Sequence, residues 1–132
     1  MLSPHHDVNY TAYRLLRVRD GKPCTLFHGY HGSRELPQDK WLRAVKRQVW
    51  NPGKKGKSPG FTSGWHVLPS KGQCVDYLER FTAKDDIVVC RVEVKALREK
   101  PRSKVLLCDH MKINSIDWAT ALQEHGYVGS TD

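Results

Sequence analysis

Alternation of hydrophobic and polar residues is the strongest structural signal in this chain, and it predicts strands in most places. The clearest case begins at Ile87, where every second residue is Val or Cys up to Val94. In an earlier run, Tyr13 and Leu15 alternate with arginines, which predicts a half-buried strand with one wet, basic side. A short apolar run that ends in proline, residues 64–69, predicts a further strand. The expected strands are thus residues 11–19, 64–69, 87–94 and 104–110.

A spacing of about three residues between apolar side chains predicts two helices. They are expected at residues 73–81 and 116–125, with the inward-facing residues Val75, Leu78, Phe81, Ile116, Ala119 and Leu122. Ser70 or a neighbour would cap the first helix, and Ser115 or Asn114 would cap the second. Gly126 would end the second helix, because glycine readily takes the left-handed conformation found there.

Turn residues connect these elements. The pair Asp20-Gly21 predicts a tight hairpin whose second arm is residues 23–28, because this pair supplies the positive φ that a two-residue reversal requires. Residues 38–49 suit a helix or a strand, and we favour a short helical turn that passes into a strand. Residues 54–60 form a glycine- and lysine-rich loop. The whole predicts an α+β fold: a mostly antiparallel or mixed sheet, with two helices covering one sheet face.

Length and composition indicate one domain. The chain has 132 residues, and we expect a flexible N-terminus at residues 1–10 and a single α+β domain at residues 11–132. No apolar run approaches the roughly 18 residues of a membrane span, and the first residues lack the pattern of a secretion signal. The 4 cysteines form no CxxC pair. We therefore expect a cytoplasmic protein with core cysteines and no metal site.

Positive charge is concentrated in residues 40–75, which contain no Asp or Glu and are interleaved with tryptophans. The cations of this stretch account for the formal net charge of +8. Cations attract polyanions, and aromatic rings can stack on bases. The competing interpretation is a solvated lysine face over core aromatic residues. We expect a non-catalytic contact with nucleic acid or a nucleoprotein through Lys40, Arg43, Lys46, Arg47, Trp50, Lys54, Lys55 and Lys57.

Short motifs along the chain resemble those of small uncharacterised tailed-phage proteins. The motifs are a Leu-Phe strand, a Pro-to-Trp-Leu step, a GWH strand and a late CEVEV-like strand, here residues 26–27, 37–42, 64–66 and 90–94. This resemblance implies a phage accessory protein that acts in the host cytoplasm, and it implies no known activity.

A second resemblance is to the poly-ADP-ribose-polymerase-like ADP-ribosyltransferases. It is carried, in this order along the chain, by residues 27–33 (FHGYHGS), 64–77 and 90–94. It implies that family's fold and, as an alternative function, an enzyme that uses NAD as cofactor. His28 or His31 would then hold the nicotinamide ribose, and Ser33 would supply the neighbouring hydroxyl. Trp65 or His66 would stack on the nicotinamide. The glutamate that this family places at the start of the later strand is missing from residues 101–104.

A third interpretation is an inhibitor that docks on an acidic host protein, such as a component of a defence system. A positive surface attracts an acidic protein by the same long-range field that attracts nucleic acid. A protein partner that survives nuclease treatment in a pull-down would separate this interpretation from the first. No cofactor is expected for the nucleic-acid contact or for the inhibitor.

Overall fold

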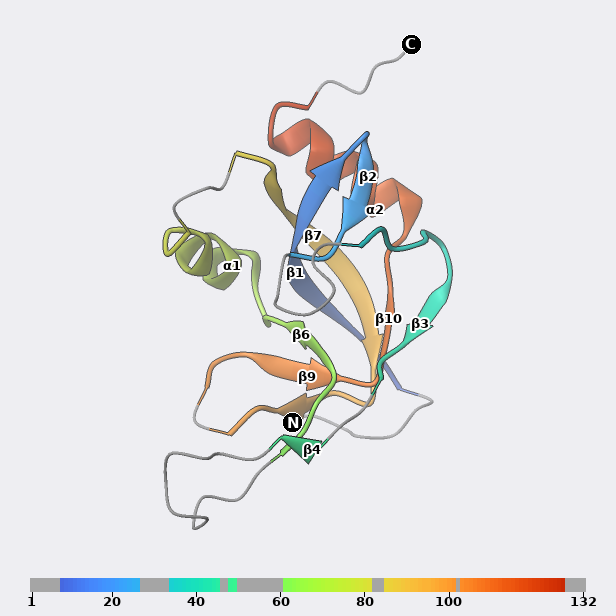
Figure 1. The fold of residues 1–132 in the computed structure, drawn as a ribbon, viewed down its shortest axis with the longest axis vertical. Coiled ribbons are helices and arrows are strands. Elements are labelled where there is room, and N and C mark those ends of the chain that lie inside the picture. Colours follow the sequence, from blue (N-terminus) through green and yellow to red (C-terminus); the bar gives the residue numbers. More distant parts are fainter. Residues whose placement is uncertain are drawn as a thin grey trace.

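The computed structural model describes residues 8–26, 34–45, 48–49, 61–81, 85–101 and 103–127. They form an α+β fold with antiparallel strand pairs and two helices, as predicted (Figure 1). The strands are β1 (Asn9–Arg19), β2 (Lys22–Cys24), β3 (Trp41–Arg43), β4 (Gln48–Val49), β5 (Phe61–Thr62), β6 (Trp65–Val67), β7 (Ile87–Lys95), β8 (Arg98–Glu99), β9 (Leu106–Cys108) and β10 (His110–Lys112). The helices are α1 (Lys71–Leu78) and α2 (Ser115–Glu124).

Within the described residues, the largest sheet has the strand order β2-β1-β7-β10-β3. A smaller sheet has the order β6-β9-β8, and β4 pairs with β5. The long strands β1 and β7 pair from Asn9 opposite Lys95 to Arg17 opposite Ile87, and they form the centre of the fold. The predicted hairpin turn follows β1, where Asp20 and Gly21 have φ values of 53° and 76°. Its second arm is shorter than predicted, because β2 ends at Cys24 and residues 25–26 are not in a strand.

Both faces of the β1–β7 pair are buried. One face belongs to a first core cluster, which includes Ala12, Leu16, Trp65, Val67, Val92, Met111 and Trp118. The other face contributes Leu15 and Val89 to a second core cluster, which also contains Cys74 of α1. The prediction of a half-buried β1 with a wet, basic side is therefore wrong in its central part. The alternation along β1 shows which of its own side chains are polar. It does not show that helix α1 covers the second side of the strand.

Helix α1 is capped as predicted, because the Ser70 hydroxyl accepts a hydrogen bond from the backbone N–H of Gln73 at 3.2 Å. The helix begins at Lys71 and ends at Leu78, one turn earlier than expected. Cys74 is its fully buried residue, whereas Val75 is 43% exposed. The prediction that Val75 faces the core is wrong, because the buried side of this short helix centres on Cys74.

Helix α2 follows Asn114, as predicted, and ends before Gly126, whose φ is 82°. Its orientation differs from the prediction, because Trp118 is buried while Ile116 is 78% exposed. Ala121 is the other buried residue of the helix, and Ala119 is exposed. The indole N–H of Trp118 donates to the backbone oxygen of the β1–β2 turn at 2.9 Å, so this large ring decides which side of the helix faces inward.

The two helices do not cover one sheet face, contrary to the prediction. Cys74 of α1 belongs to the second core cluster, and Trp118 of α2 belongs to the first. Near its C-terminus α2 lies beside β7, where the Nε2 atom of His125 accepts a hydrogen bond from the backbone N–H of Val89 at 3.0 Å. The Val89 N–H, which has no partner on a described neighbouring strand, thus finds a hydrogen-bond acceptor.

Two further segments differ from the predictions. Residues 38–45 contain β3 and bends but no helical turn. The strand predicted at residues 104–110 is divided at Asp109, so that β9 joins the small sheet and β10 joins the large one. Arg98 fixes this joint, because its guanidinium lies 2.6 Å from the Asp109 carboxylate and donates to the backbone oxygen of Ser63 at 2.8 Å. Gly64 is required beside it, since a Cβ there would lie 2.6 Å from the Cys108 oxygen.

Candidate functional site

Strands β3, β10 and β7 are neighbours at one end of the large sheet (Figure 1). Their pairing brings cations together there. The strand register forms two rows across these strands, Arg43–His110–Lys95 and Trp41–Lys112–Glu93. The residues between the rows, Leu42, Met111 and Val94, pack in the first core cluster. Because side chains alternate along a strand, the two rows point away from that core. We call Trp41, Arg43, Lys95, His110 and Lys112 the cationic sheet face.

Trp41 is the aromatic centre of the cationic sheet face. The Nζ atoms of Lys95 and Lys112 lie 4.4 Å and 5.8 Å from the centroid of its ring, within the range of a cation–π contact. Trp41 is partly exposed, and Arg43 is exposed. This arrangement places a flat ring among cations that reach solvent.

The acidic groups near the cationic sheet face are held in other contacts. Glu93 accepts a hydrogen bond from the side-chain amide of Asn114. Asp39 accepts a hydrogen bond from the backbone N–H of Ser115 at 2.9 Å, and this contact, with a smaller contribution from Lys112, lowers the pKa of the Asp39 carboxyl. Among the described residues, no carboxylate lies within ion-pair distance of Lys112. These donors are neutral and leave both carboxylates charged, so the face is net positive only because Arg43, Lys95 and Lys112 outnumber Glu93 and Asp39.

The structure places part of the predicted nucleic-acid site on this face. Arg43 belongs to it, and Lys40 is exposed directly before β3. The remaining predicted residues, Lys46, Arg47, Trp50, Lys54, Lys55 and Lys57, lie outside the described residues. Lys95, His110 and Lys112 were not predicted, because they are far from residues 40–57 in the sequence and only strand pairing brings them to Trp41.

Of the residues proposed for NAD, His28, His31 and Ser33 lie outside the described residues. Trp65 is only 9% exposed, and its indole N–H donates to the backbone oxygen of Leu42 at 2.9 Å. It belongs to the first core cluster, so its described position gives it a structural role.

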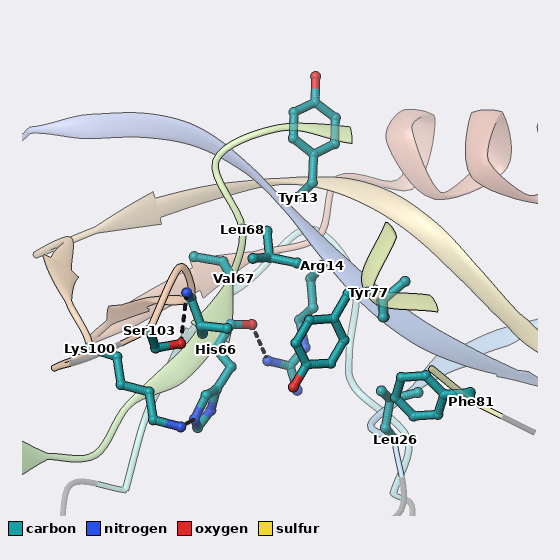
Figure 2. A pocket seen from close by; sticks show the side chains of 12 residues that line it. Tyr13, Arg14, Leu26, His66, Val67, Leu68, Tyr77, Phe81, Lys100 and Ser103 are labelled. Atoms are coloured by element: carbon teal, nitrogen blue, oxygen red, sulfur yellow. Dashed lines mark hydrogen bonds between the residues drawn. The ribbon is translucent and has the colours of Figure 1, made fainter. Parts of the chain in front are cut away.

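A cavity of about 370 Å³ lies among β1, β6, α1 and the β8–β9 connection (Figure 2). Its lining residues are Tyr13, Arg14, Leu15, Leu26, His66, Val67, Leu68, Tyr77, Phe81, Lys100, Ser103 and Val105. This lining, which we call the arginine pocket, contains cationic, aromatic and aliphatic side chains, and no Asp or Glu occurs among these described residues. The sequence carries no signal for this pocket, since its lining comes from distant parts of the chain.

Arg14 occupies the centre of the arginine pocket. One terminal nitrogen of its guanidinium donates to the backbone oxygen of His66 at 2.7 Å, and its carbon Cζ lies 5.4 Å from the centroid of the Trp65 ring. Burial, with a smaller contribution from the nearby Arg34, lowers the pKa of Arg14 to about 10. Its Nε atom is buried without a hydrogen-bond partner in the described part of the chain. The prediction that Arg14 lies on a solvated strand side is therefore wrong.

The cysteines at positions 24, 74, 90 and 108 are buried, as the apolar runs around Cys90 and Cys108 predict for those two. Burial raises the pKa of the Cys74, Cys90 and Cys108 thiols to about 12. These side chains are therefore protonated near neutral pH, which makes them poor nucleophiles.

Comparisons with models of known protein families, with curated proteins and with solved structures find no match to this chain. The resemblances to phage proteins and to ADP-ribosyltransferases thus stay predictions from short motifs. Within residues 8–127, apart from the undescribed gaps, no three or more His, Cys, Asp and Glu side chains are grouped to hold a metal ion. No helix in this part of the chain is long and apolar enough to span a membrane.

Proposed function

We propose that this protein binds single-stranded nucleic acid on the cationic sheet face and carries out no reaction there. The observation that carries the proposal is the pair of cross-strand rows that surrounds Trp41 with Arg43, Lys95 and Lys112. Proteins bind single strands through cationic surfaces that follow the phosphates and through aromatic rings on which bases stack. The cationic sheet face combines both features.

A base that stacks on Trp41 would take the place of a lysine Nζ at the ring. The displaced lysine ammonium would then contact a phosphate of the same nucleic-acid strand. Both the Trp41 ring and the ammonium would thus contact the bound nucleic acid. Three neighbouring strands span roughly 10 Å, which is less than a typical site of several nucleotides. The remaining contacts in this proposal come from Lys40 and from Lys46, Arg47, Trp50, Lys54, Lys55 and Lys57 in the same acid-free stretch.

The experiment is a titration of a fluorescent single-stranded oligonucleotide, followed by anisotropy at several salt concentrations. Affinity is expected to fall steeply with salt, because bound cations release counterions from the phosphates. Trp41→Ala should weaken binding by about 1–3 kcal/mol, the usual contribution of one base stacked on an aromatic ring. Trp41→Phe is the matched control, since it keeps a ring for stacking. Binding that is absent, insensitive to salt or unchanged in Trp41→Ala would contradict the proposal.

The two alternative functions have less support from the described residues. An acidic protein could contact the same cationic sheet face, and a protein partner that survives nuclease treatment in a pull-down would support that alternative. For NAD chemistry, Trp65 and His66 are the described candidates for stacking on the nicotinamide. The core position of Trp65 does not favour that role, whereas His66 lines the arginine pocket.

A further inference from the structure

We propose that the arginine pocket binds a small organic anion, in which a phosphate or carboxylate group is carried on a flat apolar body. This site is separate from the cationic sheet face, and the proposal does not depend on nucleic-acid binding.

The charge balance of the pocket calls for an anion. A buried cation is stable only when opposite charge or hydrogen-bond acceptors replace its lost water. Arg14 has one such acceptor, the His66 backbone oxygen, while its Nε–H has none among the described residues. The described residues also provide no carboxylate in ion-pair contact with Arg14. A phosphate or carboxylate group in the pocket would supply the missing opposite charge, and a guanidinium binds both groups through its N–H donors.

A second cation lies at the same end of the pocket. Lys100 and His66 point toward one another in Figure 2, and Lys100 Nζ lies 3.4 Å from the Nε2 atom of His66. The hydroxyl of Ser103 lies beside Lys100 and His66 and accepts a hydrogen bond from the backbone N–H of Val105 at 3.0 Å. An anionic group between Arg14 and Lys100 would therefore meet positive charge from two sides.

The opposite end of the pocket is apolar and fits a flat ring. Tyr77, Phe81 and Leu26 lie beyond Arg14 in Figure 2, and Leu68 and Val67 line the adjoining wall. The volume of about 370 Å³ falls at the lower end of the range for small-molecule sites, about 300–1,000 Å³. The shape and polarity thus favour a compact amphiphilic anion, with its head at Arg14 and its ring beside Tyr77 and Phe81.

Isothermal titration calorimetry with phenyl phosphate and with benzoate tests this proposal. At least one of the two is expected to bind with a stoichiometry of one, and the tighter ligand identifies the preferred anionic group. Benzyl alcohol, which keeps the ring without the charge, should bind about tenfold more weakly or not at all, because charged hydrogen bonds carry most of the affinity. Equal binding of benzyl alcohol, or no binding of either anion at millimolar concentration, would overturn the proposal.

Variants locate the binding in the arginine pocket. Lys100→Gln at the pocket rim should weaken phenyl phosphate binding about tenfold, whereas Lys104→Gln, on the same connection but outside the lining, should leave it unchanged. Arg14→Lys is expected to weaken it at least as much, since an ammonium lacks the planar pair of donors. Lys100→Gln keeps the test valid if Arg14→Lys does not fold. Equal binding by Lys100→Gln and the unaltered protein would overturn the assignment.

The same measurement separates the two sites. Lys112→Glu on the cationic sheet face should leave phenyl phosphate binding unchanged, even if it abolishes binding of an oligonucleotide. Loss of phenyl phosphate binding in Lys112→Glu, with no loss in Lys100→Gln, would place the anion on the sheet face and would overturn the pocket proposal.

Discussion

At the scale of single residues, burial changes the chemistry of side chains that the sequence presents as ordinary. Arg14 occurs in a run of alternating arginines, yet the fold encloses its Nε and lowers its pKa to about 10. His125 is another example, because its ring accepts a backbone hydrogen bond and is part of the fold. Such roles depend on neighbours from distant segments, so the pattern around each residue does not predict them.

Protonation of His125 is expected to destabilise the fold. Burial is the main cause that lowers the pKa of His125 below its ordinary value of 6.5, while Glu124 opposes the shift and Lys71 adds to it. The unfolded chain therefore takes up this proton at higher pH than the folded chain. The contribution of His125 is complete above pH 6.5 and decreases as the pH falls through the interval below 6.5.

This pH dependence is measured by urea unfolding at about pH 7.5 and about pH 5.5, on either side of the ordinary histidine pKa. His125→Gln is the matched control, since its side-chain oxygen can accept the Val89 N–H but does not titrate. The loss of unfolding free energy at the lower pH should be larger for the unaltered protein than for His125→Gln. Equal losses would show that His125 is not responsible.

At the scale of elements, the joint between the two sheets decides where the strands lie. Asp109 lies between the last residue of β9 and the first residue of β10. The guanidinium of Arg98 lies 2.6 Å from its carboxylate. The backbone N–H of Asp109 also donates a hydrogen bond to the backbone oxygen of Lys95. The backbone oxygen of Asp109 accepts a hydrogen bond from the N–H of Ala44. Three neighbouring segments are thus connected through a single residue.

Asp109→Ala is expected to reduce the free energy of unfolding by about 3 kcal/mol, because it leaves the partly buried Arg98 guanidinium without its anion. Glu124→Ala is the matched control. It removes an ion pair of similar length, 2.7 Å to Lys71, but both of its side chains are about half exposed. Exposed pairs contribute about 0–1 kcal/mol. Similar losses in the two variants, measured by urea unfolding, would contradict a structural role for the joint.

Much of the element pattern could be predicted from local signals. The Asp20-Gly21 hairpin, the strand from Ile87 and the Ser70 cap each depend on neighbouring residues, and the structure confirms all three. The division of a predicted strand at Asp109 could not be predicted, since its cause is Arg98 on another strand. The inward side of α2 is set by a hydrogen bond of Trp118 to a distant turn, which helical spacing does not report.

At the scale of the whole molecule, pairing of distant strands creates the cationic sheet face. Sequence analysis found Lys40 and Arg43 within an acid-free stretch, but Lys95 and Lys112 reach Trp41 only through the register of β3, β10 and β7. The arginine pocket arises in the same way from five segments of the chain. Charge composition thus indicates that a polyanion is a suitable partner, and the fold indicates where it would lie.

We propose that nucleic acid binds the cationic sheet face specifically, and not merely a protein with a net charge of +8. Lys112→Glu and Arg19→Glu test it most directly, because they change the net charge equally at opposite ends of the sheet. Arg19 is exposed at the far end of β1, roughly 33 Å along the strand from Asn9. Oligonucleotide anisotropy is expected to show about tenfold weaker binding for Lys112→Glu and little change for Arg19→Glu. Equal weakening in both variants would contradict the account.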